Sequence, residues 1–291
     1  HEAMKSSLIS REVIADSIEL SVRGHCYDAI VGLAGCDKSL PGLMMAMVRL
    51  NVPSVFIYGG SILPGKYKGK DVTVIDVFEA VGKHAAGTIN DQELKDIEQV
   101  ACPSAGSCGG QFTANTMACI SEAIGLALTN SAMPPAVNTE ERKSYGEESG
   151  KAIMRLIERN IRPRDIVTLE SLVNAARVVA ATGGSTNAAL HLPAIANEAG
   201  LKFTLKDVVE IYNSTPYIGD MQPGGKYVAK DLYDVGGVPT VIKSLLDGGY
   251  LNGDCLTVTG KTIAENHKDV IFPTNQDVVY KCDNPISENS S

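Results

Sequence analysis

The stretch from residue 27 to residue 58 constrains the fold more than any other part of the sequence. Residues 27–34 form an apolar run that is too short for a helix and is rich in the aliphatic residues of buried strands. Residues 35–42 then lead into apolar positions at helical spacing, and a second apolar run, residues 52–58, follows. Strand, loop, helix and strand in this order predict a right-handed crossover with parallel strands. We therefore expect an α/β fold in which layered parallel strands are flanked by helices.

The loop after the first predicted strand carries Cys36, Asp37 and Lys38 in succession. In open parallel sheets, ligands collect beyond the carboxyl ends of the strands, which is where this loop should lie. A soft thiol, a hard carboxylate and an amine are therefore adjacent at a position that favours chemistry. The sequence predicts a functional site here.

The stretch of residues 101–117 contains Cys102 and Cys108 and is a glycine-rich loop that runs into a helix, with Met117, Ile120, Ile124 and Leu128 on the inner face of that helix. Cys108 is expected at or just before the start of that helix, where the helix dipole would lower the pKa of its thiol. A thiolate there could bind iron or zinc, or attack an electrophile. Cys36 and Cys108 are too far apart in the sequence for a local metal clip, so their spacing alone leaves a shared metal undecided. For Cys102 a structural role is favoured over that of a fourth ligand.

Residues 182–191 repeat part of this pattern, with paired glycines followed by threonine, asparagine and an apolar helix. Anion binding at the helix start and close packing of the loop are both compatible with it. His191 lies between two leucines and is expected to be a core histidine rather than a ligand. Residues 257–262 resemble half of a phosphate-binding loop but lack its upstream glycine, so no nucleoside triphosphate site is expected.

The net charge and the cysteine content limit which partners and which cellular compartment are expected for this chain. With 26 basic and 34 acidic residues the net charge is −8, which argues against nucleic acid and anionic membranes as partners. No apolar run approaches the roughly 18 residues of a membrane span. Seven cysteines, an odd number in a chain of this size, indicate a reducing compartment: the cytoplasm, or the mitochondrial or plastid matrix in a eukaryote. The cysteines expected to be small buried apolar residues are Cys26, Cys119, Cys255 and Cys282.

Four motifs taken together resemble one enzyme family. Residues 35–42, 106–117, 183–188 and 253–262 are similar to the family of dihydroxy-acid and phosphogluconate dehydratases, and the similarity extends from His1 to Glu288. Residues 223–227 and 59–81 resemble the dihydroxy-acid branch. The resemblance implies the α/β N-terminal domain of a two-domain, usually homodimeric enzyme, with a β-barrel-like C-terminal domain that is absent from this sequence.

The resemblance also implies a division of the chain. Residues 1–285 would form the cluster- and metal-binding domain, as one body or as two lobes over about 1–130 and 131–285. Residues 286–291 would begin a linker to the C-terminal domain. The chain starts with histidine and ends in a polar tail, and we expect both ends to be cuts.

Site residues are implied at four positions. Cys36 and Cys108 resemble two of three cysteine ligands of an iron–sulfur cluster, of either the 2Fe–2S or the 4Fe–4S type. Asp37 resembles a Mg²⁺ ligand, and Lys38 the lysine that is carbamylated to give a second oxygen ligand for that ion. The third cysteine, further acidic ligands and the general base would lie outside this chain, so the isolated chain is expected to be inactive.

The implied activity is that of a hydro-lyase that dehydrates 2,3-dihydroxy acids, such as 2,3-dihydroxyisovalerate, to 2-keto acids in branched-chain amino acid biosynthesis. A cluster iron would act as a Lewis acid on the leaving hydroxyl, and Mg²⁺ would hold the carboxylate and the C2 oxygen. Two alternatives remain open: a sugar-acid dehydratase of the same family, acting on an aldonate or phosphogluconate, and a non-catalytic metal-binding module.

Overall fold

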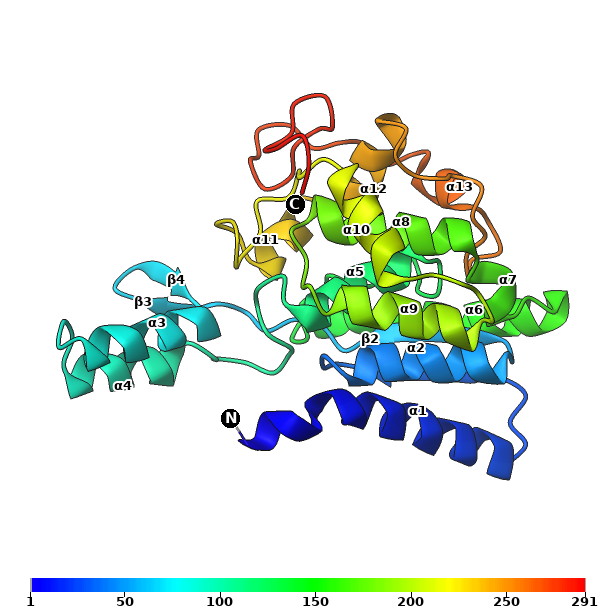
Figure 1. The fold of residues 1–291 in the computed structure, drawn as a ribbon, viewed down its shortest axis with the longest axis horizontal. Helices are drawn as coiled ribbons and strands as arrows, with labels where there is room; N and C mark the ends of the chain where they lie inside the picture. The colour runs from blue at the N-terminus through cyan, green and yellow to red at the C-terminus, as the bar shows by residue number, and fades with distance from the viewer. Residues whose placement is uncertain (1, 291) are drawn as a thin grey trace.

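A computed structural model describes residues 2–290 and shows helices packed around a small parallel sheet (Figure 1). His1, and Ser291 at the end of the expected linker, lie outside the described residues. Strand β1 (Ile30–Ala34) pairs in parallel with β2 (Ser54–Tyr58), so that Ala34 lies opposite Tyr58. Helix α2 (Ser39–Leu50) connects the two strands. The predicted crossover and the mixed α/β class are confirmed.

Helix α2 lies unusually close to β1 because of a glycine in the strand. A Cβ atom at Gly32 would lie 2.6 Å from side-chain atoms of Leu43 and Met47 in α2. The strand residues on either side, Val31 and Leu33, point away from α2 and are exposed. Alternation along the strand therefore gives β1 one face that packs against the helix and one that does not.

Two further helices enclose α2. Helix α1 (Ser7–Gly24) packs along it, and α9 (Ala188–Glu198) lies against it as well (Figure 1). Gly42 in the first turn of α2 permits the close approach of α1, because a Cβ there would lie 2.9 Å from the carbonyl oxygen of Arg11. The three helices are therefore packed together, with α2 in contact with both of the others and with β1.

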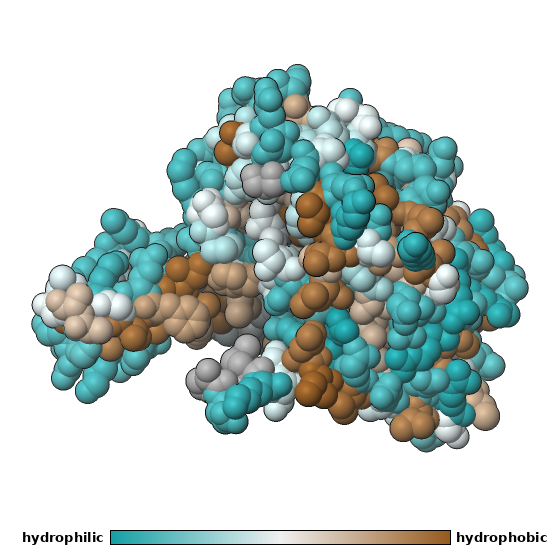
Figure 2. Space-filling model, viewed as in Figure 1, coloured by the Kyte–Doolittle hydropathy of each residue, from teal (hydrophilic) through white to brown (hydrophobic). Residues whose placement is uncertain are grey.

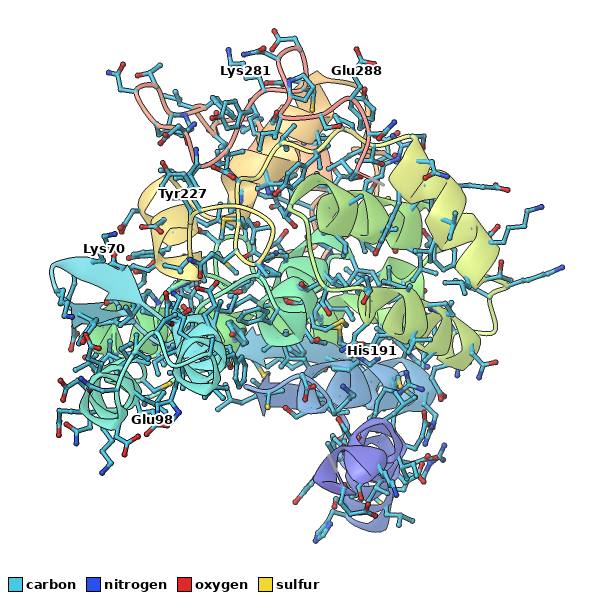
Figure 3. All side chains as sticks on the ribbon, turned by 60° about the vertical axis from the view of Figure 1, so that its left-hand side comes forward. Lys70, Glu98, His191, Tyr227, Lys281 and Glu288 are labelled. Carbon is cyan, nitrogen blue, oxygen red and sulfur yellow. The ribbon has the colours of Figure 1, made fainter. Side chains whose placement is uncertain are left out.

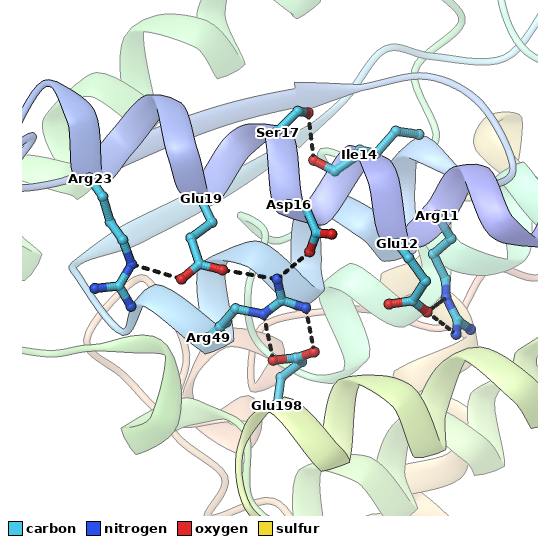
Figure 4. Close-up of polar contacts among 9 residues, drawn as sticks. All are labelled: Arg11, Glu12, Ile14, Asp16, Ser17, Glu19, Arg23, Arg49 and Glu198. Atoms are coloured by element: carbon cyan, nitrogen blue, oxygen red, sulfur yellow. Dashed lines mark hydrogen bonds and ion pairs between the residues drawn. The ribbon is translucent and has the colours of Figure 1, made fainter.

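Arg49 links these three helices through its guanidinium group (Figure 4). From α2 it binds Glu198 of α9 with two hydrogen bonds of 2.8 Å, and it binds Asp16 and Glu19 of α1 at 2.7 and 2.9 Å. The bond to Glu198, followed by that to Asp16, raises the pKa of Arg49 further above its usual range. The paired geometry makes this contact stronger than an ordinary surface ion pair.

Replacing Arg49 with methionine should lower the free energy of unfolding by about 2 kcal/mol, because it leaves the largely buried Glu198 carboxylate without its cation. Urea unfolding at pH 7 measures this loss. The control is Lys243→Met, which removes a surface pair with Asp247 within one helix and should cost at most about 0.5 kcal/mol. Equal losses in the two variants would show that Arg49 is an ordinary surface charge.

The core of the molecule is built on helix α5 (Thr113–Ala123), every residue of which is buried. Helix α8 (Leu169–Ala181) packs on it, and α9 and α12 also contact it. The remaining helices of the body are α6 (Thr139–Arg159), α7 (Pro163–Ile166), α10 (Leu205–Asn213), α11 (Ala229–Asp234), α12 (Val238–Asp247) and α13 (Ile263–His267). Over residues 2–290, none of the helices combines the length and apolar character that crossing a membrane requires.

A separate arm projects from one side of the body, at the left in Figure 1. It consists of an antiparallel hairpin, β3 (Gly65–Tyr67) and β4 (Lys70–Val72), and of helices α3 (Val74–Ala85) and α4 (Asp91–Val100). Figure 2 shows apolar side chains on the arm near its junction with the body.

Three elements differ from what the sequence pattern predicts. The glycines and lysines of residues 61–72 predict a basic loop, but this stretch contains the β3–β4 hairpin, and its Lys68 pairs with Glu93 at 3.0 Å. The pattern predicts a helix from residue 147, but α6 begins at Thr139, with two glutamates in its first turn to stabilise the start. Ser10 is predicted as the N-cap of the first helix, but α1 begins at Ser7, so Ser10 lies inside the helix.

Glu122 is a buried carboxyl group in α5 that holds the turn after the helix. Its two oxygens accept hydrogen bonds from the backbone N–H groups of Asn130 and Ala132, at 2.7 and 2.8 Å. Burial raises its pKa to about 8, against the opposing effect of these two bonds. The turn therefore depends on a carboxyl group in the interior.

Glu122→Gln should lower the free energy of unfolding by about 1–3 kcal/mol, because the amide NH₂ would face a backbone N–H that then loses its acceptor. Urea unfolding at pH 6, where the wild-type carboxyl is largely protonated, gives the value. Glu148→Gln, on an exposed part of α6, is the control and should change stability little. A near-neutral Glu122→Gln would mean that the turn does not need both acceptors.

Candidate active site

The loop after β1 is held in a tight turn at the edge of the sheet. The backbone N–H of Cys36 donates to the Ser39 hydroxyl at 3.0 Å, and that hydroxyl donates to the carbonyl oxygen of Cys36, also at 3.0 Å. The N–H of Gly59, just after β2, donates to the carbonyl of Ala34 at 2.7 Å. The loops that follow the two strands therefore leave the sheet side by side, with the Cys36 side chain exposed.

Asp37 and Lys38 form an ion pair beside Cys36. The Lys38 ammonium lies 2.9 Å from Asp37 Oδ2. The lysine side chain is only 10% exposed, whereas that of the aspartate is 39% exposed. The amine is thus largely sheltered from water, and its partner is open to an incoming ligand.

Ser107 brings the third loop to this edge. Its backbone N–H donates to the carbonyl of Gly60 at 2.9 Å, and its own carbonyl accepts from the N–H of Ile62 at 2.7 Å. Its hydroxyl donates to the carbonyl of Gly35. Gly106 has φ +133°, and a Cβ there would collide with the backbone of residues 61 and 62. One serine therefore joins all three loops, and the glycine before it permits the close approach.

The structure places Cys108 next to the Cys36 loop, although the two residues are distant in the sequence. Its thiol is exposed on one side. Partial burial raises the pKa of this thiol, and the charges of Cys36, Cys102 and Asp37 raise it further. The structure thus brings together Cys36, Asp37 and Cys108, three of the residues singled out in the sequence.

The expected effect of the helix dipole on Cys108 is wrong. Helix α5 begins only at Thr113, after Phe112 as its N-cap, so Cys108 does not lie at a helix start. Its pKa is accordingly raised rather than lowered. The glycine pair at 109–110 lies between Cys108 and the helix, so the irregular loop continues past the expected helix start.

Cys102 lies in the same loop and is exposed, close enough for its charge to act on Cys108. Among residues 2–290, however, no group of three or more histidine, cysteine or acidic side chains could hold a metal ion by itself. The donors on this chain are therefore of the right kinds but form an incomplete set. All seven cysteines, which fall within the described residues, are free. Of the four expected to be buried, Cys26 is exposed and Cys282 only partly buried, whereas Cys119 and Cys255 are buried.

His191 is part of α9 and lies where this helix faces α2 (Figure 3), close enough to Asp37 and Lys38 for their charges to act on it. It is fully buried, as predicted, and its Nδ1 lies 3.1 Å from the Arg11 guanidinium, whereas its Nε2 has no hydrogen-bond partner among residues 2–290. Burial, followed by the charges of Arg11 and Lys38, lowers its pKa to about 3, although Asp37 acts in the opposite direction. The imidazole is therefore neutral at physiological pH.

Because the pKa of His191 is lowered in the folded chain, the free energy of unfolding should decrease as the pH falls. Between about pH 6.5 and pH 3 the unfolded chain binds a proton at His191 that the folded chain does not, so stability falls as the pH falls, by up to about 1.4 kcal/mol per unit. His191→Gln should lose this contribution and show a flatter decline of unfolding free energy from pH 6 to pH 4. The exposed His25→Gln is the control, and a slope for His191→Gln parallel to wild type would contradict the assignment.

The second glycine motif packs against the first. The Thr116 hydroxyl accepts from the backbone N–H of Ser185 at 2.9 Å, and the hydroxyls of Thr113 and Ser185 lie 2.9 Å apart. The Asn187 side chain donates to Thr113 at 2.8 Å. Close packing, one of the two roles compatible with the sequence, is the one seen here.

The sequence alone did not point to the polar groups that connect the loops, chiefly Ser107, Tyr58 and Asn115. Ser107 and Asn115 both lie within the motif of residues 106–117, and Asn115 is one of several polar residues in a helix that is buried along its whole length. This mismatch between residue and environment was the signal available.

Comparison with known proteins bears on the whole chain. The family described as "Dihydroxy-acid/6-phosphogluconate dehydratase N-terminal" matches residues 1–266. The dihydroxy-acid dehydratase of Pelagibacter ubique is 70% identical over 287 residues, which cover 99% of this chain and 50% of that protein. That of Parvibaculum lavamentivorans is 69% identical with the same coverage, and that of Metallosphaera sedula is 52% identical over 272 residues, 94% of this chain and 49% of that protein. The chain thus spans about half the length of the curated relatives it matches, and it belongs to the dihydroxy-acid/6-phosphogluconate dehydratase N-terminal family.

Proposed function

We propose that this chain forms part of a hydro-lyase that converts 2,3-dihydroxy carboxylic acids to 2-keto acids, in branched-chain amino acid biosynthesis. The observation that carries the proposal is the convergence of Cys36 and Cys108, from distant loops, beside the Asp37–Lys38 pair. The relatives named dihydroxy-acid dehydratase support the substrate class.

The donor set fits the two proposed cofactors in kind. Thiolates are suited to iron, so Cys36 and Cys108 would hold an iron–sulfur cluster, of the 2Fe–2S or 4Fe–4S type. Carboxylate oxygens are suited to Mg²⁺, so Asp37 and a carbamylated Lys38 would hold that ion. Because the set on residues 2–290 is incomplete, further ligands and the general base are proposed to come from outside this chain. We propose residues 1–285 as the cluster- and metal-binding domain and 286–291 as the start of a linker.

The Asp37–Lys38 pair has a defined role in forming the carbamate. The neutral amine of Lys38 attacks CO₂, a C–N bond forms, and one proton leaves the nitrogen. Asp37 Oδ2, 2.9 Å from Nζ, is placed to accept that proton, and its exposure lets the proton pass on to water.

When bound, the cluster iron and Mg²⁺ would supply Lewis acidity to the leaving hydroxyl and to the carboxylate and C2 oxygen of the substrate. The residues of this chain orient the site. Ser39 fixes the Cys36 turn, and Ser107 ties the Cys108 loop to it. The buried, neutral His191 limits water behind Lys38. We further propose a homodimer in a reducing compartment, the cytoplasm or an organelle matrix.

Anaerobic iron–sulfur reconstitution tests this assignment, on the chain extended to the length of its relatives. Visible absorption bands should appear in the wild type and should be lost in Cys36→Ser and in Cys108→Ser, because each substitution removes one thiolate ligand. Cys26→Ser, an exposed cysteine outside the site, is the control and should keep the bands. Bands that survive both site substitutions would refute the cluster assignment.

Substrate turnover by the reconstituted protein separates the alternatives. Turnover of 2,3-dihydroxyisovalerate with little turnover of aldonates or phosphogluconate supports the proposal, and the reverse preference indicates a sugar-acid dehydratase. Cluster binding without turnover of either class indicates a non-catalytic metal-binding module.

A further inference from the structure

Asn115 is a fully buried asparagine in the first turn of α5, and both the oxygen and the nitrogen of its side-chain amide make hydrogen bonds. Its Oδ1 accepts from the hydroxyl of Tyr58 at 2.7 Å. Its Nδ2 donates to the carbonyl oxygens of Cys108 and Gly110, both at 2.6 Å. One side chain therefore holds the backbone of Cys108 itself and that of the residue two positions further on.

The other end of this connection lies at the Cys36 loop. Tyr58 is the last residue of β2, is fully buried, and lies opposite Ala34, two residues before Cys36. The path from Cys108 through Asn115 and Tyr58 thus reaches the end of the strand that carries Cys36. The bond from the Ser107 hydroxyl to the carbonyl of Gly35 is another polar connection between the cysteine loops.

The direction of these hydrogen bonds is fixed by chemistry. Burial is the main cause that raises the pKa of Tyr58, so its hydroxyl remains protonated and donates to Asn115. Two carbonyl oxygens require two N–H donors, and the asparagine NH₂ group supplies both. An aspartate at this position would place a carboxylate oxygen against these carbonyls. Neither alanine nor aspartate can replace the asparagine.

We propose that Asn115, oriented by Tyr58, is a positioning residue that fixes Cys108 relative to Cys36 and so sets the spacing of the two thiols. The consequence for a bound cluster rests on the proposed function, but the placement of the thiol does not. In Asn115→Ala two carbonyls lose their donors in the interior, and the Cys108 loop moves to find others. Cys108 then becomes more accessible, while cysteines elsewhere do not.

A matched control exists in Asn174, another buried asparagine that holds a cysteine-bearing loop. Its amide pairs with the backbone of Asn252 at 2.8 and 2.9 Å, and its Nδ2 lies 3.4 Å from the sulfur of Cys255. Asn174→Ala removes a similar number of buried hydrogen bonds away from Cys36 and Cys108. Comparison of Asn115→Ala with Asn174→Ala therefore distinguishes a local effect on Cys108 from a general loss of stability.

The test is alkylation of the 291-residue chain by iodoacetamide, with the rate at each cysteine read by peptide mass spectrometry. Asn115→Ala should raise the rate at Cys108 about fivefold or more and leave exposed Cys26 unchanged. Asn174→Ala should leave Cys108 unchanged. Tyr58→Phe keeps the ring and removes only the hydroxyl, and it should raise the alkylation rate at Cys108 by a smaller factor than Asn115→Ala does. If Asn115→Ala does not fold, Tyr58→Phe decides the question.

An unchanged Cys108 rate in the folded Asn115 and Tyr58 variants would overturn the proposal, as would an equal rise in Asn174→Ala. Because alkylation needs no cluster, this outcome is independent of the proposed function. In the reconstituted protein extended to the length of its relatives, Asn115→Ala should also alter the electron paramagnetic resonance signal of the reduced cluster, and Asn174→Ala should not. Failure of the wild type to assemble a cluster would refute the proposed function and leave the alkylation result intact.

Discussion

Parallel pairing of β1 with β2 is the constraint on which the rest of the site depends. Two parallel strands joined by a helix end at the same edge of a sheet, so the loops after Ala34 and Tyr58 must emerge together. Gly32 lets α2 approach the strand closely, which places the start of that helix, with Lys38, directly over this edge. The loop that carries Cys108 is attached to this same edge.

Polar side chains, several of them buried, attach the Cys108 loop to the rest of the site. Ser107 and Asn115 join it to the strand ends, and Thr113 and Thr116 join the following helix to the second glycine motif. Such a network is stable only when each member has a partner, and a fully bonded network specifies one arrangement of the loops. The apolar packing of α5 and α8 stabilises the fold, and the polar network fixes the positions of the loops relative to one another.

The sequence predicted the crossover because its signals are local. Apolar spacing marks α2, and the apolar runs on either side of it mark β1 and β2. The sequence also identified Cys36, Asp37 and Lys38 from their place after a strand and Cys108 from its glycine-rich loop, and the family resemblance linked the two cysteines to one site.

The approach of Cys108 to Cys36 could not be derived from spacing, since it depends on contacts between segments that are far apart along the chain. The pKa of Cys108 was also predicted with the wrong sign, because the helix was expected to begin at or just after Cys108, whereas the loop continues through the glycine pair at 109–110 and the helix begins only at Thr113. The roles of Tyr58 and Asn115 likewise became visible only in three dimensions.

The arm leaves the body and returns to it at one narrow neck. At this neck, residues 60–63 on the outgoing strand bond to residues 104–107 on the returning strand, through Ser107 and the Ser104 hydroxyl. The two segments that connect the arm to the body are therefore hydrogen-bonded to each other just before the chain reaches Cys108. Insertions and deletions in the hairpin or between α3 and α4 can change the length of the arm during evolution without moving the loops that carry Cys36 and Cys108. The outer part of the arm can therefore diversify while the candidate site is preserved.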